Sequence, residues 1–232
     1  MLRAVSLKTD LSGIRCGHRT LATLGDVFAH QNADIVGSAY LVAQIPPLHG
    51  LPEIAVTGRA NVGKSTLLNA VMGRKDLVHT SKKAGHTRSL NFYRVGPGPG
   101  KLVLVDAPGY GTRGRPEWGE IWDHYIQNRS QLRRIYVLIN AKHGVEEADS
   151  FVLADLHERC LSMGGTRWTF QAVVTKVDSL PTKQLRAGLS KIREDVWKAA
   201  PTCLPPIVTA AAARERFGID EVRKSMMEAC GI

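Results

Sequence analysis

Residues 53–65, EIAVTGRANVGKS, decide the fold of this 232-residue chain. The β-branched run 53–57 is typical of a strand, the pattern G-x-x-x-x-G-K-S follows it directly over residues 58–65, and a helical pattern begins at Lys64. A strand, a glycine-containing loop and a helix in this order form the phosphate-binding P-loop, whose backbone N–H groups and helix N-terminus attract an anionic phosphate. We therefore expect a nucleotide at this loop.

The loop and the first turn of the helix supply the expected phosphate contacts. Lys64 is expected to reach the β- and γ-phosphates, which makes it a candidate catalytic residue, and the Ser65 hydroxyl is expected to bind Mg²⁺. The nucleotide-binding residues that we expect in this segment are Gly58, Arg59, Ala60, Asn61, Val62, Gly63, Lys64, Ser65 and Thr66.

Beyond the P-loop, short apolar runs alternate with helical patterns, which is typical of a mostly parallel sheet covered by helices. The turn-forming stretch 96–100, GPGPG, indicates one antiparallel hairpin. The expected fold is therefore α/β: a doubly wound P-loop domain with a six-stranded, mostly parallel sheet and helices on both faces. The expected strands are 53–57, 90–95, 101–106, 134–140, 169–175 and 206–209, and the expected helices are 64–72, 118–130, 148–162, 182–199 and 219–229.

The sequence Thr175-Lys176-Val177-Asp178 indicates which base is bound. It follows a late apolar strand, and open α/β sheets bind ligands at the carboxyl ends of their strands. A carboxylate at Asp178 can accept hydrogen bonds from N1 and N2 of guanine, a donor pair that adenine lacks, while the Lys176 stem lies along the base. Guanine would also meet the loop after the last strand, Thr209, Ala210 and Ala211. We expect GTP and GDP as ligands.

The sequence Asp106-Ala107-Pro108-Gly109 follows another expected strand and completes the expected site. Asp106 would hold Mg²⁺ through a water molecule, and the Gly109 amide would sense the γ-phosphate. Thr87, in the polar stretch 80–89, is the candidate to close over Mg²⁺ in the triphosphate state. Ordering of these loops by the γ-phosphate and their release on hydrolysis predict a GTP switch, with Lys64, Thr87 and Gly109 as its catalytic residues and Ser65, Thr87 and Asp106 as its Mg²⁺ ligands.

Tyr110 follows Gly109, where Ras-like GTPases have a glutamine that orients the attacking water. An aromatic side chain cannot do this through amide hydrogen bonds. We therefore expect slow intrinsic hydrolysis that depends on a partner or on a cation. Asn61 is placed as in GTPases that bind K⁺ beside the phosphates, so K⁺ is the expected cation.

The chain is basic, with a formal net charge of +10 and a sequence pI near 9.7. This balance favours a polyanionic partner, with nucleic acid first and an anionic membrane surface second. Most of the excess lies in residues 74–115, where nine Lys and Arg stand against two Asp and Glu. The four cysteines are scattered without metal-ligand or disulfide spacing, and no apolar run approaches the length that spans a bilayer.

The N-terminal residues 1–20 carry four basic residues against one acid. This composition is compatible with an organelle transit peptide, and the alternative is a short basic arm. We expect residues 1–45 to form an N-terminal extension and residues 46–232 to form the GTP-binding domain.

These motifs together resemble the EngB (YihA/YsxC) family of ribosome-biogenesis GTPases. The matching stretches are 52–55, 58–65, 80–87, 91–93, 106–111, 125–129 and 175–178. His86 before Thr87 is similar to the mitochondrial-type branch, which together with the basic N-terminus favours the mitochondrial matrix over the cytoplasm. The chain departs from the family pattern at Ala84, at Asn140 and in the loop 209–211.

The resemblance implies an assembly factor that binds a precursor of the large ribosomal subunit and leaves after GTP hydrolysis. Its implied partners are rRNA and ribosomal proteins or other assembly factors, and the protein is expected to be monomeric off the ribosome. Two alternatives stay open from the residues. A P-loop kinase or ATPase would leave Lys176 and Asp178 without a role, whereas a nucleotide-stabilised rRNA-binding scaffold with negligible turnover is compatible with Tyr110.

Overall fold

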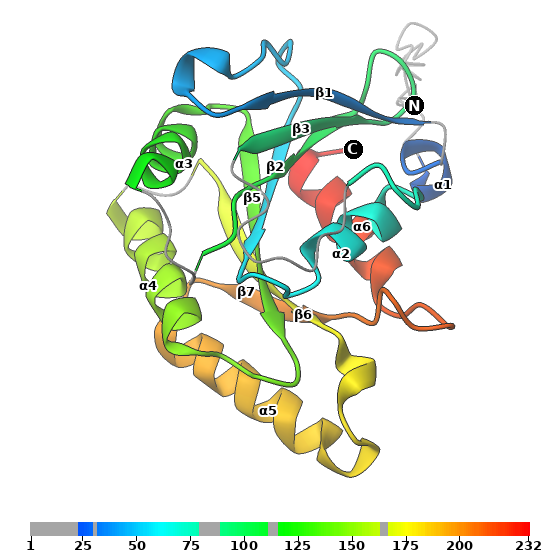
Figure 1. Cartoon of the computed structure of the whole chain (residues 1–232), viewed down its shortest axis with the longest axis vertical. Helices are drawn as coiled ribbons and strands as arrows, with labels where there is room; N and C mark the ends of the chain where they lie inside the picture. The colour runs from blue at the N-terminus through cyan, green and yellow to red at the C-terminus, as the bar shows by residue number, and fades with distance from the viewer. Residues whose placement is uncertain (1–22, 30–31, 79–88, 111–115, 163–166) are drawn as a thin grey trace, which may run out of the picture.

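A seven-stranded sheet lies at the centre of the computed structural model, which describes residues 23–29, 32–78, 89–110, 116–162 and 167–232 (Figure 1). The order of the strands across the sheet is β1-β3-β4-β2-β5-β6-β7. Their bounds are β1 Ala33–Ala39, β2 Glu53–Gly58, β3 Leu90–Val95, β4 Leu102–Asp106, β5 Leu132–Asn140, β6 Thr169–Thr175 and β7 Leu204–Val208.

Neighbouring strands in the part of the sheet ordered β4-β2-β5-β6-β7 pair in parallel. β3 pairs antiparallel with β4, as the turn 96–100 predicts. The predicted number of six strands is wrong. The additional strand, β1, comes from the expected N-terminal extension and pairs antiparallel with β3, from Ala33 opposite Val95 to Ala39 opposite Leu90. β1 lies at the edge of the sheet and most of its residues are exposed, so it lacks the apolar run that marks the buried strands.

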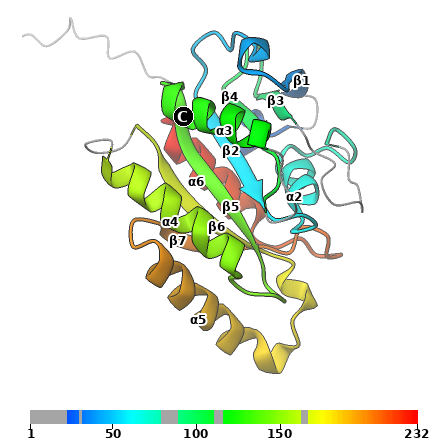
Figure 2. The ribbon, with the colours of Figure 1, turned by 60° about the vertical axis from the view of Figure 1, so that its left-hand side comes forward.

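Helices cover both faces of the sheet, which confirms the doubly wound α/β fold (Figures 1 and 2). One core cluster joins α3, α4 and α5 to one face, and the other joins α2 and α6 to the opposite face. Neighbouring residues of β2 divide between the two clusters, Ala55 in the first and Ile54 in the second, because successive side chains of a strand point to opposite faces. The longer helices are α2 Lys64–Val71, α3 Pro116–Asn128, α4 Glu147–Ser162, α5 Thr182–Ala199 and α6 Ile219–Cys230.

Short helical segments complete the described chain, and their bounds are α1 Leu24–Val27, η2 Val42–Gln44 and η3 Val177–Ser179. Of the helices in the described ranges, none combines the length and the apolar composition that a membrane crossing needs.

The parallel strands bring the expected functional residues to one edge of the sheet. β2, β4, β5 and β6 run in the same direction, so their last residues, Gly58, Asp106, Asn140 and Thr175, lie along the same carboxyl edge. After β2 the chain passes through α2 on one face, and after β4 it returns through α3 on the other face to β5. The end of β2 is thus a topological switch point, where open α/β sheets bind ligands.

Candidate functional site

The loop between β2 and α2 has the tight curl that the glycine pattern predicts. Gly58 ends β2 so close to its neighbours that a Cβ there would lie 2.9 Å from both Leu138 Cβ and Val62 Cγ1. Gly63 immediately before α2 has a φ of 108°, and Asn61 has a φ of 60°. Left-handed backbone is open to glycine and tolerated by asparagine, so these residue types permit the turn into the helix.

Lys64 and Asp106 meet at the carboxyl edge of the sheet. Both side chains are buried, and Lys64 Nζ donates a hydrogen bond to Asp106 Oδ1 within an ion pair. Ser65 follows Lys64 in the first turn of α2 and is half-buried. A hydroxyl and a carboxylate are the oxygen donors that Mg²⁺ prefers, so the donor set of Ser65 and Asp106 fits this ion.

Gly109 lies against the backbone of the P-loop. A Cβ at Gly109 would lie 3.1 Å from the carbonyl oxygen of Gly58 and 3.6 Å from the amide nitrogen of Ala60. The preceding residue is held as well, because Thr57 Oγ1 donates to the carbonyl of Pro108 at 3.2 Å. Glycine at position 109 therefore leaves free the space beside the P-loop that a side chain would occupy.

The predicted base-binding residues contact the P-loop from β6. Lys176 Nζ donates to the carbonyl oxygen of Asn61 at 2.7 Å, and Thr175 Oγ1 donates to that of Val62 at 2.6 Å. Lys176 has a φ of 56°, and its left-handed backbone turns the chain from β6 into η3, which contains the exposed Asp178. The lysine stem thus lies across the loop, beside the expected position of the base.

The expected guanine loop is held beside this motif. The Val177 amide donates to the carbonyl of Thr209 at 3.2 Å, which joins the two segments. The Ala210 amide donates to the carbonyl of Phe217 at 3.0 Å. The amide of Ala210 is thus already used within the loop, and the amide of half-buried Ala211 is the next one along the chain that could face a base.

The structure therefore brings the P-loop, Asp106, Gly109, residues 175–178 and residues 209–211 to one edge of the sheet. Thr87 lies outside the described residues. Asn61 is exposed and lines a pocket of about 320 Å³ beside the P-loop. The other residues that line this pocket are Arg59, Ala60, Val62, Asn140, His143, Glu146 and Lys176.

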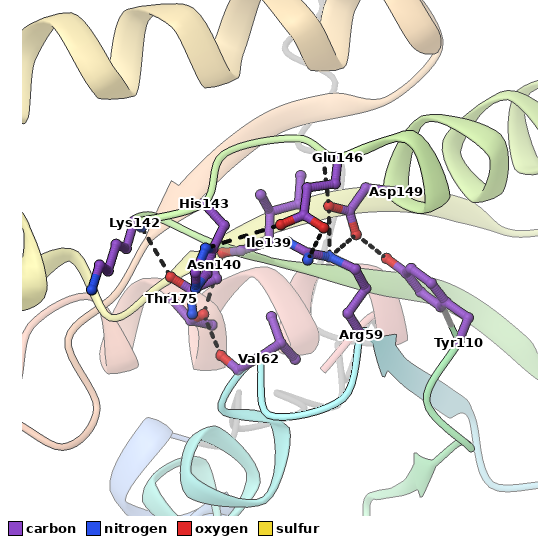
Figure 3. Close-up of polar contacts among 10 residues, drawn as sticks. All are labelled: Arg59, Val62, Tyr110, Ile139, Asn140, Lys142, His143, Glu146, Asp149 and Thr175. Atoms are coloured by element: carbon purple, nitrogen blue, oxygen red, sulfur yellow. Dashed lines mark hydrogen bonds and ion pairs between the residues drawn. The ribbon is translucent and has the colours of Figure 1, made fainter. Parts of the chain in front are cut away.

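A buried cluster around Asp149, at the start of α4, has no counterpart in the sequence-based prediction (Figure 3). Asp149 is 0% exposed. Arg59 Nε lies 3.0 Å from each of its carboxylate oxygens, and Tyr110 Oη donates to its Oδ1 at 3.0 Å. Arg59 Nη1 also pairs with Glu146, whose amide donates to Asp149 Oδ2 at 3.0 Å. The P-loop and the residue after Gly109 therefore share one carboxylate.

Burial and charge shift the proton affinities of this cluster. Burial, followed by the charge of Asp149 and its hydrogen bond, raises the pKa of Tyr110 well above its usual value. Burial alone would lower the pKa of Arg59, but Asp149 and Glu146 outweigh it and the pKa is raised. Tyr110 is therefore a neutral hydroxyl donor, and Arg59 is a cation held between two acids. One atom, Arg59 Nη2, is buried without a hydrogen-bond partner among the described residues.

The only sequence signal for this cluster is the charge of Arg59 within a phosphate-binding loop, which calls for a compensating acid. The acid that compensates it lies 90 residues further along the chain. Nothing in the sequence distinguishes Asp149 from the other acidic residues of the helical pattern 148–162.

A second buried carboxylate, Glu53 at the start of β2, resembles the first in its partners. Tyr125 Oη donates to Glu53 Oε2 at 2.6 Å, and Arg129 Nε lies 3.1 Å from Oε1. Burial, followed by the charge of Glu53, raises the pKa of Tyr125 well above its usual value. This cluster joins the first residue of β2 to the end of α3, at the opposite end of β2 from the P-loop.

Comparison with known proteins places this geometry in context. Residues 53–167 match the family model described as 50S ribosome-binding GTPase. Among curated proteins, "Probable GTP-binding protein EngB" of Rhodopseudomonas palustris (strain BisA53) is 36% identical over 192 residues, which cover 81% of this chain and 84% of the relative. The protein of the same name from Bradyrhizobium diazoefficiens is 36% identical over 190 residues, covering 80% of this chain and 82% of the relative.

Among solved structures, Era in complex with MgGDPNP and nucleotides 1506–1542 of 16S ribosomal RNA aligns with a TM-score of 0.58 and 23% identity. The alignment covers 77% of this chain and 56% of that chain. A structure of the chloroplast translocon components atToc33 and psToc159 aligns with a TM-score of 0.61 and 14% identity, over 78% and 83% of the two chains. At sequence identities this low, the structural similarity shows that these proteins share the fold of this chain.

Proposed function

The chain belongs to the EngB family of GTP-binding proteins, and from this membership we propose that it assists assembly of the large ribosomal subunit as a GTP-driven switch. The protein binds and hydrolyses GTP. One observation carries the proposal: the P-loop, Asp106 with Gly109, and the motif 175–178 converge at the carboxyl edge of the sheet.

In this proposal Lys64 binds the β- and γ-phosphates, while the backbone of residues 58–63 surrounds the β-phosphate. The support is that Lys64 Nζ already reaches the end of β4, where it contacts Asp106. Ser65, Thr87 and Asp106 are the residues that would hold Mg²⁺. The ion, when bound, offsets negative charge on the phosphate oxygens.

The guanine base would be held from two sides of the same edge. Asp178 would accept from N1 and N2 of the base, and the stem of Lys176 would lie along its face. The exposure of Asp178 and the position of Lys176 over the P-loop support this arrangement. Thr175 donates a hydrogen bond to the P-loop. The loop 209–211 would offer a backbone amide to the base.

Hydrolysis transfers the γ-phosphoryl group to water and releases GDP. We propose that the intrinsic rate is slow, because Tyr110 donates its hydroxyl to Asp149 and so has no hydrogen bond left to donate to an attacking water. We also propose that K⁺ next to Asn61 accelerates the reaction. Equal rates in K⁺ and Na⁺ buffers, with and without ribosomal subunits, would contradict the role of K⁺.

The proposed partner is the precursor of the large ribosomal subunit, contacted through rRNA and ribosomal proteins or other assembly factors, with the free protein monomeric. The matched family description, 50S ribosome-binding GTPase, and the basic stretch 74–115 support this proposal. We further propose a mitochondrial matrix location, supported by the basic N-terminal residues and by His86. The domain that carries these functions is proposed to be 46–232, to which residues 33–39 add the edge strand.

Sedimentation of the tagged protein with ribosomal subunits tests the switch. We expect co-sedimentation with the large subunit in a non-hydrolysable GTP analogue and its loss in GDP. Lys64→Ala should abolish nucleotide binding and block subunit maturation. A Lys64→Ala protein that binds no nucleotide yet supports normal maturation would contradict the switch and favour a scaffold.

A further inference from the structure

We infer that Asp149 is a positioning residue for the GTP site. Its buried carboxylate holds Tyr110 (Figure 3). Through Tyr110 it holds the neighbouring Gly109 against the P-loop. This inference rests on the proposed contact between the Gly109 amide and the γ-phosphate.

Among the residues that the structure describes, three contacts fix residues 108–110. Thr57 Oγ1 donates to the carbonyl of Pro108, and the backbones of Arg59 and Tyr110 form an isolated parallel bridge. The third contact, from Tyr110 Oη to Asp149, is the one that reaches a helix, α4. The first two contacts hold the backbone on the side of β2, whereas the third holds the far end of a large side chain that packs against the core.

The same carboxylate also binds the P-loop. Arg59 Nε approaches both oxygens of Asp149 at 3.0 Å. Asp149 therefore holds the P-loop and residues 108–110 in one position relative to each other. Asp149 is itself fixed, because it lies in the first turn of α4 and accepts from the Glu146 amide at 3.0 Å. A carboxylate in the first turn of a helix is also favoured by the helix dipole.

This arrangement has a consequence that depends on the nucleotide. GTP has a γ-phosphate for the Gly109 amide to contact, whereas GDP has none. Loosening Tyr110 should therefore weaken the binding of GTP and leave the binding of GDP nearly unchanged. A hydrogen bond to a charged group is worth about tenfold in an equilibrium constant or somewhat more. We expect the ratio of GTP affinity to GDP affinity to fall about tenfold.

Tyr110→Phe is the sharpest test, because it removes the hydroxyl and keeps the ring. Tyr125→Phe is the control: it removes the bond from a more deeply buried tyrosine to another buried carboxylate, at the opposite end of β2. Dissociation constants for a non-hydrolysable GTP analogue and for GDP, together with kcat and KM for GTP, are measured for both variants. We expect Tyr110→Phe to lower the affinity ratio and kcat, and Tyr125→Phe to leave both unchanged.

A second pair of variants tests the carboxylate itself. Asp149→Asn keeps an acceptor oxygen for Tyr110 but lacks the charge that balances Arg59, so its affinity ratio should fall by less than that of Asp149→Ala. Where Asp149→Ala fails to fold, the double variant Tyr110→Phe with Asp149→Asn replaces it. Its effect on the affinity ratio should be smaller than the product of the single effects, because both changes act on one bond.

Two results would overturn the inference: an unchanged affinity ratio in Tyr110→Phe, or equal changes in Tyr110→Phe and Tyr125→Phe. Lys64→Ala separates this failure from failure of the proposed function. If Lys64→Ala loses nucleotide binding while Tyr110→Phe behaves as wild type, the GTP site stands and the role of Asp149 is wrong. If Lys64→Ala binds GTP normally, the proposed site is wrong.

Discussion

Thr175 Oγ1 lies 2.6 Å from the carbonyl oxygen of Val62, so the last residue of β6 is hydrogen-bonded to the backbone of the P-loop. The same hydroxyl lies 3.2 Å from the carbonyl of Ile139 on β5. One side chain therefore ties the phosphate loop to two strands that follow it by 77 and 113 residues along the sequence.

Thr175→Val tests this tie, because it keeps the shape of the side chain and removes the donor. We expect a loss of about 1–2 kcal/mol in the free energy of unfolding, since the buried carbonyl of Val62 loses its partner. GDP should also bind more weakly to Thr175→Val than to the wild-type protein. Urea denaturation and GDP titration measure the two effects, and Thr175→Ser, which keeps the hydroxyl, should stay near wild type in both.

Gly109→Ala tests the close approach of Gly109 to the P-loop. The added methyl group would lie 3.1 Å from the carbonyl oxygen of Gly58, so either the loop or the segment after Asp106 must shift. We expect GTP affinity to fall about tenfold, the weight of one strong hydrogen bond.

Gly119→Ala is the matched control for this change. Gly119 lies inside α3, and a Cβ there meets nothing within 4 Å. This variant should be stabilised by about 0.5–1 kcal/mol, because alanine is the better helix former. GTP affinity unchanged in Gly109→Ala would contradict the proposed geometry.

Asp178→Asn tests base recognition. The change removes the carboxylate that is proposed to accept from N1 and N2 of guanine, so GTP affinity should fall by about a hundredfold or more. Folding should be unaffected, because Asp178 is exposed. Competition between GTP and ATP measures the preference. Asp195→Asn on α5, which removes an acid that pairs with Lys191, should leave the preference intact.

Stability above pH 10 should depend on Tyr93. Burial, followed by the charge of Asp106, raises the pKa of Tyr93 from 10.0 to about 12. The unfolded chain therefore loses this proton near pH 10 while the folded protein keeps it, so the free energy of unfolding falls as pH rises from 10 to about 12. The slope per proton is about 1.4 kcal/mol per pH unit.

Urea denaturation at pH 9, 10 and 11 checks this slope. Tyr93→Phe has no proton to lose at this position, so its free energy of unfolding should fall less steeply than that of wild type. Parallel curves for the two proteins would contradict the shift.

The proposed binding to rRNA should depend on salt differently in the two nucleotide states. The basic stretch 74–115 includes the expected switch loops, so the number of phosphates it contacts should change between GTP and GDP. Titrations of an rRNA fragment at several salt concentrations give the slope in each state. Lys101→Gln should reduce the slope by about one in the state that uses it, whereas Lys191→Gln on α5 should not. Identical slopes in both states would count against coupling.

Much of the site could be predicted because its motifs are contiguous. Gly63 permits the left-handed turn of the loop whatever surrounds it. The alternation of apolar strands with helical patterns brings Asp106 and Thr175 to the edge that carries Gly58. β1 escaped prediction for the opposite reason. Its pairing with β3 leaves most of its side chains in water, so no apolar pattern marks it.

The sequence by itself determined the kind of ligand, since local residue types and their spacing define the phosphate loop and the motif that is proposed to bind the base. The tertiary structure alone decided which acid balances Arg59 and where Tyr110 directs its hydroxyl. These choices depend on how α4 packs against the sheet. That packing brings Asp149 next to Arg59, which lies 90 positions before it in the sequence, and next to Tyr110, which lies 39 positions before it. A charge must be paired when it is buried, but only packing selects its partner.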